Sequence, residues 1–421
     1  MQSALVPDKT GRPRRWLRMI GIRLAAVTVA SLVAVILAEI VVRVAGLGAD
    51  QLLRSDPLLG VRFIPATRGL SQGPCYSTEV TTNSQGWRSP EFTQAKPAGV
   101  LRVLVLGDSF MAGVQVDDNQ TFARVLESRL RTSGIQRQVE VINLGVPSWG
   151  TDQEYVALRE FGRALDPDLV VLAFYAQNDV SDNDVGMRLR VSRYLKPYFK
   201  LENGGLVEVP LVESTPASIR LARRLTAPWR LYPLVRDGLI SIPAAHRLLY
   251  ALDLIDVVPS RETRREFVTS PRDWPERWNT QTGVFESPVS TDWARGWQIT
   301  EALLGKVDAE SRAGGARLLV LQLPSPLEVM PPELRAQLTR TPGLELDVDL
   351  PTARLAGIAG RLGLDVVSLV PVFRERIGAD MASFEALYLK CDGHWTATGH
   401  LLAALSAMPA IAARLNDGRQ P

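Results

Sequence analysis

Five apolar segments of strand length recur after residue 100, and segments with helical spacing separate them. The apolar segments are 101–106, 139–145, 168–179, 316–324 and 364–370, and the helical ones cover about 120–132, 153–165, 295–312 and 352–362. Alternation of this kind predicts parallel strands joined by right-handed crossovers, with helices on both faces of the sheet. We therefore expect an α/β fold, a three-layer sandwich with a mainly parallel five-stranded sheet.

The first of these segments continues into a turn, and residues 101–113 read LRVLVLGDSFMAG. Its apolar run has the composition of a strand that is covered on both faces, and Gly107, Asp108 and Ser109 follow it. A strand, turn and helix deliver one side chain to the carboxyl edge of the sheet, where open α/β folds keep their chemistry. Ser109 is that side chain. The alternative is ordinary turn chemistry, since glycine, aspartate and serine all favour turns and helix caps.

A basic tail and an apolar run precede the α/β part. Residues 1–23 carry six basic side chains and one acidic, whereas the rest of the chain has 42 basic and 44 acidic residues. The chain after residue 23 is thus nearly neutral, and we expect no nucleic-acid partner. Residues 24–42 hold one charge, that of Glu39, and are long enough to span a bilayer as a helix. Glu39 and Arg43 are four residues apart and can pair where this helix leaves the hydrocarbon.

The basic flank before the span predicts the topology of the chain. The positive-inside tendency leaves the N-terminus in the cytoplasm and residues 50–421 outside it. We expect a single-pass inner-membrane protein with a periplasmic domain. The alternative is a cleaved signal peptide, because small residues follow the apolar run at 45–49. Under both interpretations, residues 50–421 lie outside the cytoplasm.

The remaining segments complete the expected organisation. It consists of a basic cytoplasmic tail (1–23), an anchor (24–47), a connector with little regular structure that packs on the domain (48–100), and an α/β domain (101–415) with an insertion at about 183–294. The insertion contains an expected hairpin at 198–209, with Asn203-Gly204-Gly205 at its turn, and an arginine-rich helical stretch at 218–257. That stretch is either an amphipathic helix that covers the domain or a lid or membrane-surface element near the anchor.

The chain has two cysteines, Cys75 and Cys391, which are far apart in sequence. Export would place them in a compartment where disulfides persist, and we expect them to be bonded. Two free thiols are the alternative, because the sequence does not show whether their Cα atoms come within bonding range.

Polar residues stand at the ends of several expected strands. Gly145 ends the second strand, Asn178 the third, and Asp392 and His394 lie near the C-terminus. Strand ends at one edge of a parallel sheet converge in space, so these residues could meet Ser109 there. Acyl transfer requires such a set: a hydroxyl nucleophile, an imidazole base, a carboxylate that orients it, and donors for the oxyanion.

Four motif blocks together resemble the SGNH hydrolase superfamily, also called GDSL-like esterases, and its membrane-anchored bacterial members in particular. The blocks are GDSF with Ser109, NLG with Gly145, QND with Asn178, and DGHW with Asp392 and His394. The resemblance covers residues 100–180 and 385–402 and implies a flavodoxin-like fold. One departure is the spacing Asp-x-His, where many members have Asp-x-x-His.

The resemblance also implies a role for each residue, and the chemistry of each side chain allows it. Ser109 would attack an ester carbonyl, His394 would take its proton, and Asp392 would orient the imidazole. The backbone amides of Ser109 and Gly145 and the side-chain amide of Asn178 would hold the oxyanion.

Other polar residues have simpler interpretations. We expect Asp108 and Asp179 to brace local backbone, His246 and His400 to be structural, and Trp395 to pack or to shape an acyl pocket. His400 is the alternative base. Two cysteines and three histidines lack the spacing of a zinc site, and no phosphate-binding glycine loop follows a strand, so no metal or cofactor is expected.

The expected function is that of an exported, membrane-anchored serine esterase that cleaves acyl esters, O-acetyl groups on an envelope glycan in particular. A first alternative is an O-acyltransferase, in which a sugar hydroxyl instead of water resolves the same acyl-enzyme. A second is a non-catalytic glycan-binding or assembly protein that retains the fold. The intact set of Ser109, Asn178, Asp392 and His394 argues against this second alternative.

Overall fold

The computed structural model describes residues 12–47, 50–191, 196–209, 221, 225, 229–240, 242, 244–245, 282–333, 335 and 346–417. Five strands form the central sheet, namely β5 (Val100–Leu106), β6 (Gln138–Asn143), β7 (Leu169–Phe174), β10 (Arg317–Gln322) and β11 (Asp365–Ser368). Their order is β11-β10-β7-β5-β6, and every neighbouring pair is parallel. Numbered along the chain this is the order 2-1-3-4-5 of flavodoxin-like folds. The predicted five-stranded parallel sheet is confirmed.

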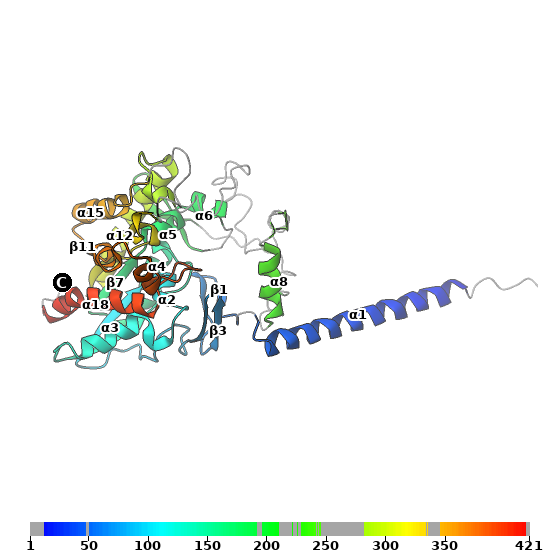
Figure 1. The fold of residues 1–421 in the computed structure, drawn as a ribbon. Helices are drawn as coiled ribbons and strands as arrows, with labels where there is room; N and C mark the ends of the chain where they lie inside the picture. Colours follow the sequence, from blue (N-terminus) through cyan, green and yellow to red (C-terminus); the bar gives the residue numbers. More distant parts are fainter. Residues whose placement is uncertain are drawn as a thin grey trace, which may run out of the picture.

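Helices cover both faces of the sheet (Figure 1). Side chains of β5 alternate between the faces, as the strand pleat requires. Val103 and Val105 pack into one core with α3 (Phe122–Arg131) and α18 (Ala397–Asn416). Leu104 and Leu106 pack into the other core with α4 (Thr151–Ala157), α12 (Thr291–Ala313) and α15 (Leu350–Leu362). A strand buried on both faces explains why its sequence is a continuous apolar run.

Shorter helices connect these layers. They are α2 (Ser109–Ala112), η1 (Asp118–Gln120), η2 (Leu158–Gly162), η3 (Arg163–Leu165), α5 (Ala176–Asn183), α6 (Val185–Val191), η4 (Gly283–Phe285), α13 (Pro326–Val329), α16 (Val370–Ile377) and α17 (Met381–Leu387). The helix predicted over 153–165 is α4 continued by η2, a π-helical turn, and by η3.

The connector before β5 has more regular structure than its sequence suggested. It forms two antiparallel hairpins, β1 (Leu53–Asp56) with β2 (Gly60–Phe63) and β3 (Arg68–Gly73) with β4 (Tyr76–Thr81). The turns of these hairpins lie at residues 57–59 and 74–75, in segments rich in proline and glycine, because turn-forming residues serve hairpins as well as loops. The expectation of little regular structure is therefore wrong. Leu59, Phe63 and Trp87 of this segment are buried.

The insertion is described only in part. The hairpin predicted at 198–209 is present as β8 (Tyr198–Glu202) and β9 (Gly205–Val209), with Asn203 and Gly204 at its turn. Of the stretch 218–257, the structure describes α8 (Leu231–Ile240) and a few flanking residues. Most of that stretch, including His246, lies outside the described residues.

The first helix, α1 (Arg12–Val44), projects away from the α/β body (Figure 1). Trp16–Val44 has a mean hydropathy of 2.5, and it is the one helix in the described part of the chain that is long and apolar enough to cross a membrane. The predicted pair within it is confirmed, since Arg43 Nε lies 2.6 Å from Glu39 Oε1.

A disulfide joins Cys75 to Cys391, whose Cα atoms are 6.0 Å apart. Cys75 lies in the turn between β3 and β4, and Cys391 precedes Asp392. The bond therefore ties the hairpin to the loop that carries the Asp–His pair.

We expect the double variant Cys75→Ser/Cys391→Ser to lose about 4 kcal/mol of unfolding free energy, because the bond closes a loop over a sequence separation of 316 residues. Urea unfolding of the full chain in detergent micelles measures this loss. Wild-type protein treated with reductant is the matched control, and its unfolding free energy should equal that of the variant. An unfolding free energy equal to that of the oxidised wild type would contradict the prediction.

Candidate active site

The sequence after β5 delivers Ser109 at the start of a short helix. Asp108 caps α2, because its carboxylate accepts a hydrogen bond of 2.9 Å from the backbone N–H of Phe110. Ser109 is the first residue of α2, and its backbone N–H belongs to the first helical turn, where N–H groups have no acceptor within the helix. Burial raises the pKa of Asp108, although hydrogen bonds from Asn178 and Phe110 act in the opposite direction. The bracing role predicted for Asp108 agrees with these contacts.

Ser109, His394 and Asp392 form a connected chain of hydrogen bonds. Ser109 Oγ lies 2.7 Å from His394 Nε2, although the two residues are 285 positions apart in sequence. His394 Nδ1 is hydrogen-bonded to Asp392 Oδ1. Burial alone would raise the pKa of Asp392, but the hydrogen bond and charge of His394 hold that pKa below its usual value. This is the arrangement in which an imidazole can take a proton from a serine hydroxyl.

A tight turn brings Asp392 and His394 together. The N–H of Gly393 donates to Leu389 O at 2.7 Å, and the N–H of Leu389 donates to His394 O at 2.8 Å. Gly393 has a φ of 81°, in the left-handed region that favours glycine. The turn lets the two side chains meet across a single intervening residue, which accounts for the spacing Asp-x-His.

Asn178 lies in the first turn of α5 and not at the end of the third strand. Strand β7 ends at Phe174, and the Asp179 carboxylate accepts a hydrogen bond of 2.8 Å from the backbone N–H of Tyr175, which starts the helix. The predicted bracing role of Asp179 agrees with this bond. Asn178 Nδ2 donates to Asp108 Oδ2 at 2.8 Å, which holds the amide beside the residue that precedes Ser109. An amide nitrogen carries two hydrogens, so this bond uses one of them.

The backbone N–H of Gly145, which was predicted as an oxyanion donor, has an acceptor within the protein. This N–H donates to Asn143 Oδ1 at 3.0 Å. Asn143 in turn donates to Met111 O at 2.8 Å. A Cβ atom at Gly145 would lie 2.6 Å from Met111 Cβ, so glycine is required here for the close packing of this turn against α2. Gly145 accordingly contributes to packing in this structure and presents no unbonded N–H for an oxyanion.

His400 and Trp395 belong to the core. The two rings contact edge to face with centroids 5.4 Å apart, and both side chains are buried. Trp395 also packs on Phe110 and Phe373. Burial, together with the charge of Arg88, lowers the pKa of His400 to about 3. A ring that stays neutral in the core is structural, as expected, and His394 is the histidine that contacts Ser109.

The pKa of His400 predicts a loss of stability in acid. Because the native pKa of about 3 lies below the unfolded value of 6.5, the unfolded chain binds a proton that the native chain does not, and stability falls as pH falls from 6.5 towards 3. We expect about 2 kcal/mol of this loss between pH 7 and pH 5. The difference in unfolding free energy between these pH values should shrink by that amount in His400→Gln. An unchanged difference would show that His400 does not cause the acid sensitivity.

The structure adds contacts that the sequence did not indicate. Gln115 Nε2 donates to Asp392 Oδ2 at 3.3 Å, and Thr78 of β4 donates to the backbone carbonyl of Gln115 at 3.1 Å. The hairpin that carries Cys75 thus supports the orienting carboxylate twice, through the disulfide and through Gln115. No sequence signal marks Gln115, because it depends on contacts between distant segments.

Buried carboxylates also lie within electrostatic reach of Asp108. Burial, together with the charges of Asp108 and Asp152, raises the pKa of Glu154 well above its usual value. Asp152 is paired with the buried Lys196 at 2.6 Å. Glu154 lies in the segment 153–165 that the sequence predicts as helical, but its burial follows only from the packing of α4 against α5 and α12.

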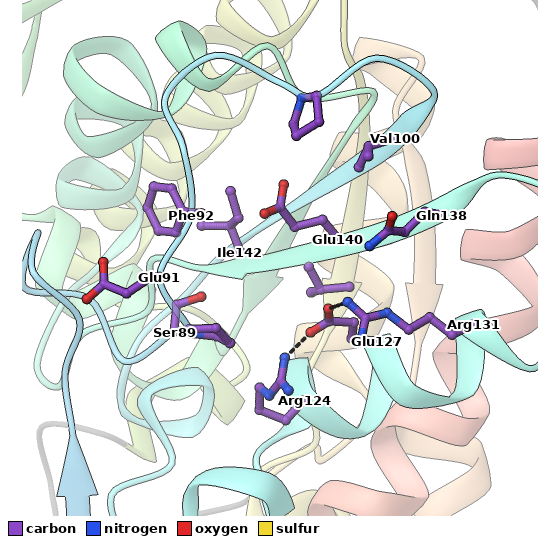
Figure 2. Close-up of a pocket in the computed structure, with 13 residues that line it drawn as sticks. Ser89, Glu91, Phe92, Val100, Arg124, Glu127, Arg131, Gln138, Glu140 and Ile142 are labelled. Carbon is purple, nitrogen blue, oxygen red and sulfur yellow. Dashed lines mark hydrogen bonds and ion pairs between the residues drawn. The ribbon is translucent and has the colours of Figure 1, made fainter.

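A cavity of about 340 Å³ lies elsewhere, between α3, β6 and the loop before β5 (Figure 2). Arg124 and Arg131 both pair with Glu127 on its wall. None of the three residues Ser109, Asp392 and His394 lines this cavity. Among the residues that the structure describes, no group of three or more His, Cys, Asp or Glu side chains is placed to hold a metal ion.

Comparison with known proteins gives likenesses at the level of solved structures. No family model matches the chain, and no curated protein matches it either. The structure titled TesA is 13% identical with a TM-score of 0.36 and covers 74% of this chain and 99% of its own. The acetyl xylan esterase AlAXEase is 11% identical with a TM-score of 0.37, and covers 74% of this chain and 100% of its own.

A third similar structure is Axe2, an acetylxylan esterase from Geobacillus stearothermophilus. It is 12% identical with a TM-score of 0.37 and covers 75% of this chain and 94% of its own.

Proposed function

We propose that this chain is a serine hydrolase of the SGNH type that cleaves acyl esters through an acyl-enzyme on Ser109. The observation that carries this proposal is the 2.7 Å contact between Ser109 Oγ and His394 Nε2, with Asp392 hydrogen-bonded to the other ring nitrogen. The flavodoxin-like sheet and the four motif blocks support the same conclusion.

The proposed reaction proceeds in two halves. Ser109 Oγ attacks the ester carbonyl as His394 Nε2 takes its proton, and Asp392 balances the charge of the imidazolium. His394 then gives the proton to the departing alcohol, which leaves the acyl group on Ser109. A water molecule gives a proton to His394 Nε2 and attacks the acyl carbonyl, and His394 then returns that proton to Ser109 Oγ as the bond between Oγ and the acyl carbon breaks and the acid leaves.

The oxyanion requires donors, and two are placed near Ser109. We assign them to the backbone N–H of Ser109 and the second N–H of the Asn178 amide, each of which contributes ~3 kcal/mol in such sites. The proposed set of oxyanion donors does not include Gly145, which the resemblance implied as a third donor, because its N–H is bonded to Asn143.

The proposed location is the periplasmic face of the inner membrane. The basic flank of α1 and its length support an anchor with its N-terminus inside the cytoplasm. We propose the 24–47 anchor, the 48–100 connector and the 101–415 domain with its insertion as the functional organisation. An O-acetyl ester of an envelope glycan is the substrate that this location favours, and transfer to a sugar hydroxyl remains the second candidate activity.

Two experiments test this proposal. A fluorophosphonate probe should label the full chain in detergent at Ser109, since such probes trap serine activated by a base, and absence of label would contradict the proposal. Incubation of the enzyme with an acetylated glycan and candidate acceptors separates the two activities: free acetate indicates hydrolysis, and an acetylated acceptor indicates transfer.

A further inference from the structure

Helix α8 exposes an apolar face that no described part of the domain covers. Leu234, Val235 and Leu239 are 42%, 50% and 42% exposed, and Ile242 just beyond the helix is 52% exposed. At 100° per residue Leu234, Val235 and Leu239 fall on one side of α8. Large apolar side chains gathered on one exposed helix face indicate an interaction surface. A helix that covers the domain, the first expectation for this stretch, would bury that face.

The beginning of α8 is bonded to the end of the membrane-spanning helix. Glu39 of α1 accepts hydrogen bonds from the backbone N–H groups of Arg230 at 3.0 Å and Leu231 at 2.8 Å. Glu39 therefore satisfies N–H groups at the start of α8 that have no acceptor within the helix. The guanidinium of Arg230 also binds both carboxylate oxygens of Asp50, each at 2.7 Å. These contacts attach α8 to the chain on both sides of the end of α1.

The position of Glu39 sets the level of α8 along α1. Glu39 lies five residues before Val44, the last residue of α1, which corresponds to about 7.5 Å along the helix axis. Helix α8 lies beside this end of α1 and runs across its axis and not along it (Figure 1). If α1 crosses the bilayer, α8 therefore lies in the plane of the interface where α1 emerges.

We propose that α8 is an interfacial helix, and that its face of Leu234, Val235 and Leu239 inserts into the lipid leaflet through which α1 leaves the membrane. Continuity with the anchor supports lipid as the occupant, because the same hydrogen bonds that start α8 hold it at the end of the span. An apolar helix face at this depth is the geometry of monotopic membrane binding. The body then has two attachments to the bilayer, which restricts its rotation about α1. The inference requires the anchor but not the esterase activity.

Spin labels on the full chain test this proposal. The native cysteines form a disulfide, so a maleimide nitroxide reacts with an introduced cysteine only. We would label Val235→Cys in α8, Val33→Cys within α1, and Leu405→Cys on α18, where the side chain is 39% exposed. Each protein is reconstituted in nanodiscs of phosphatidylcholine and phosphatidylglycerol at 3:1. Power saturation then measures the collision of each label with oxygen, which partitions into lipid, and with a water-soluble nickel chelate.

The expected result is that the label at 235 collides with oxygen severalfold more than with nickel, as at 33, whereas the label at 405 shows the reverse. In a Leu234→Asp/Leu239→Asp background the label at 235 should shift towards the values at 405. Equal values at 235 and 405 in the parent chain would overturn the proposal. A label at 235 shielded from both agents would also overturn it, since protein would then cover the face. Nickel access at 33 would instead overturn the anchor itself, whatever the esterase assays show.

Discussion

Ser109→Ala is expected to lower kcat for hydrolysis of p-nitrophenyl acetate by roughly 10⁴-fold or more. The acyl-enzyme cannot form without the hydroxyl that lies 2.7 Å from His394 Nε2. The full chain in detergent micelles, assayed by release of p-nitrophenol at saturating substrate, measures the effect.

Ser133→Ala is the matched control, because Ser133 is an exposed serine at the end of α3 whose hydroxyl bonds to Leu130 O. It should retain the wild-type rate. Both variants should keep the far-ultraviolet circular dichroism and thermal midpoint of the wild type. A Ser109→Ala protein that is folded and equally active would remove Ser109 as the nucleophile.

The second large effect is expected for Asp392→Asn, which should lower kcat by about 10³- to 10⁴-fold. Asp392 Oδ1 holds the Nδ1–H of His394, and an amide at this position can instead present its own N–H and favour the wrong tautomer of the ring. The same ester assay gives kcat and KM separately. We expect KM to change little, because Asp392 reaches the substrate only through His394.

Asp365→Asn is the control for this substitution. Asp365 lies on the edge strand β11, where it pairs with Arg414 of α18, outside the hydrogen-bond network of Ser109. The kcat of Gln115→Ala should fall between those of Asp392→Asn and Asp365→Asn, because this substitution removes a single hydrogen bond of 3.3 Å to Asp392 Oδ2. A rate for Asp392→Asn within tenfold of the wild type would show that another group orients His394.

The local pattern of apolar residues was sufficient to predict most strands and helices of the α/β fold. Each sheet strand is a short apolar run, and each predicted helix between strands has an apolar face, so periodicity within a few residues locates them. Where the pattern was ambiguous, the expectation failed. Turn-forming residues in the connector serve hairpins as well as loops, and the segment DLVVLAFYAQND continues as a strand only to Phe174 before α5 begins.

The sequence by itself determined the α/β architecture and the apolar span, and it predicted that Ser109, Asp392 and His394 would meet, because these depend on local composition and on four short motif blocks. Only the tertiary structure showed that the N–H of Gly145 is bonded to Asn143 and that the Asn178 amide is bonded to Asp108. The tertiary structure likewise revealed the hydrogen bond from Gln115 to Asp392 and the hydrogen bond from the backbone N–H of Arg230, at the start of α8, to Glu39. These are contacts between segments that are distant in sequence, and their geometry follows from how the layers pack and not from any local period.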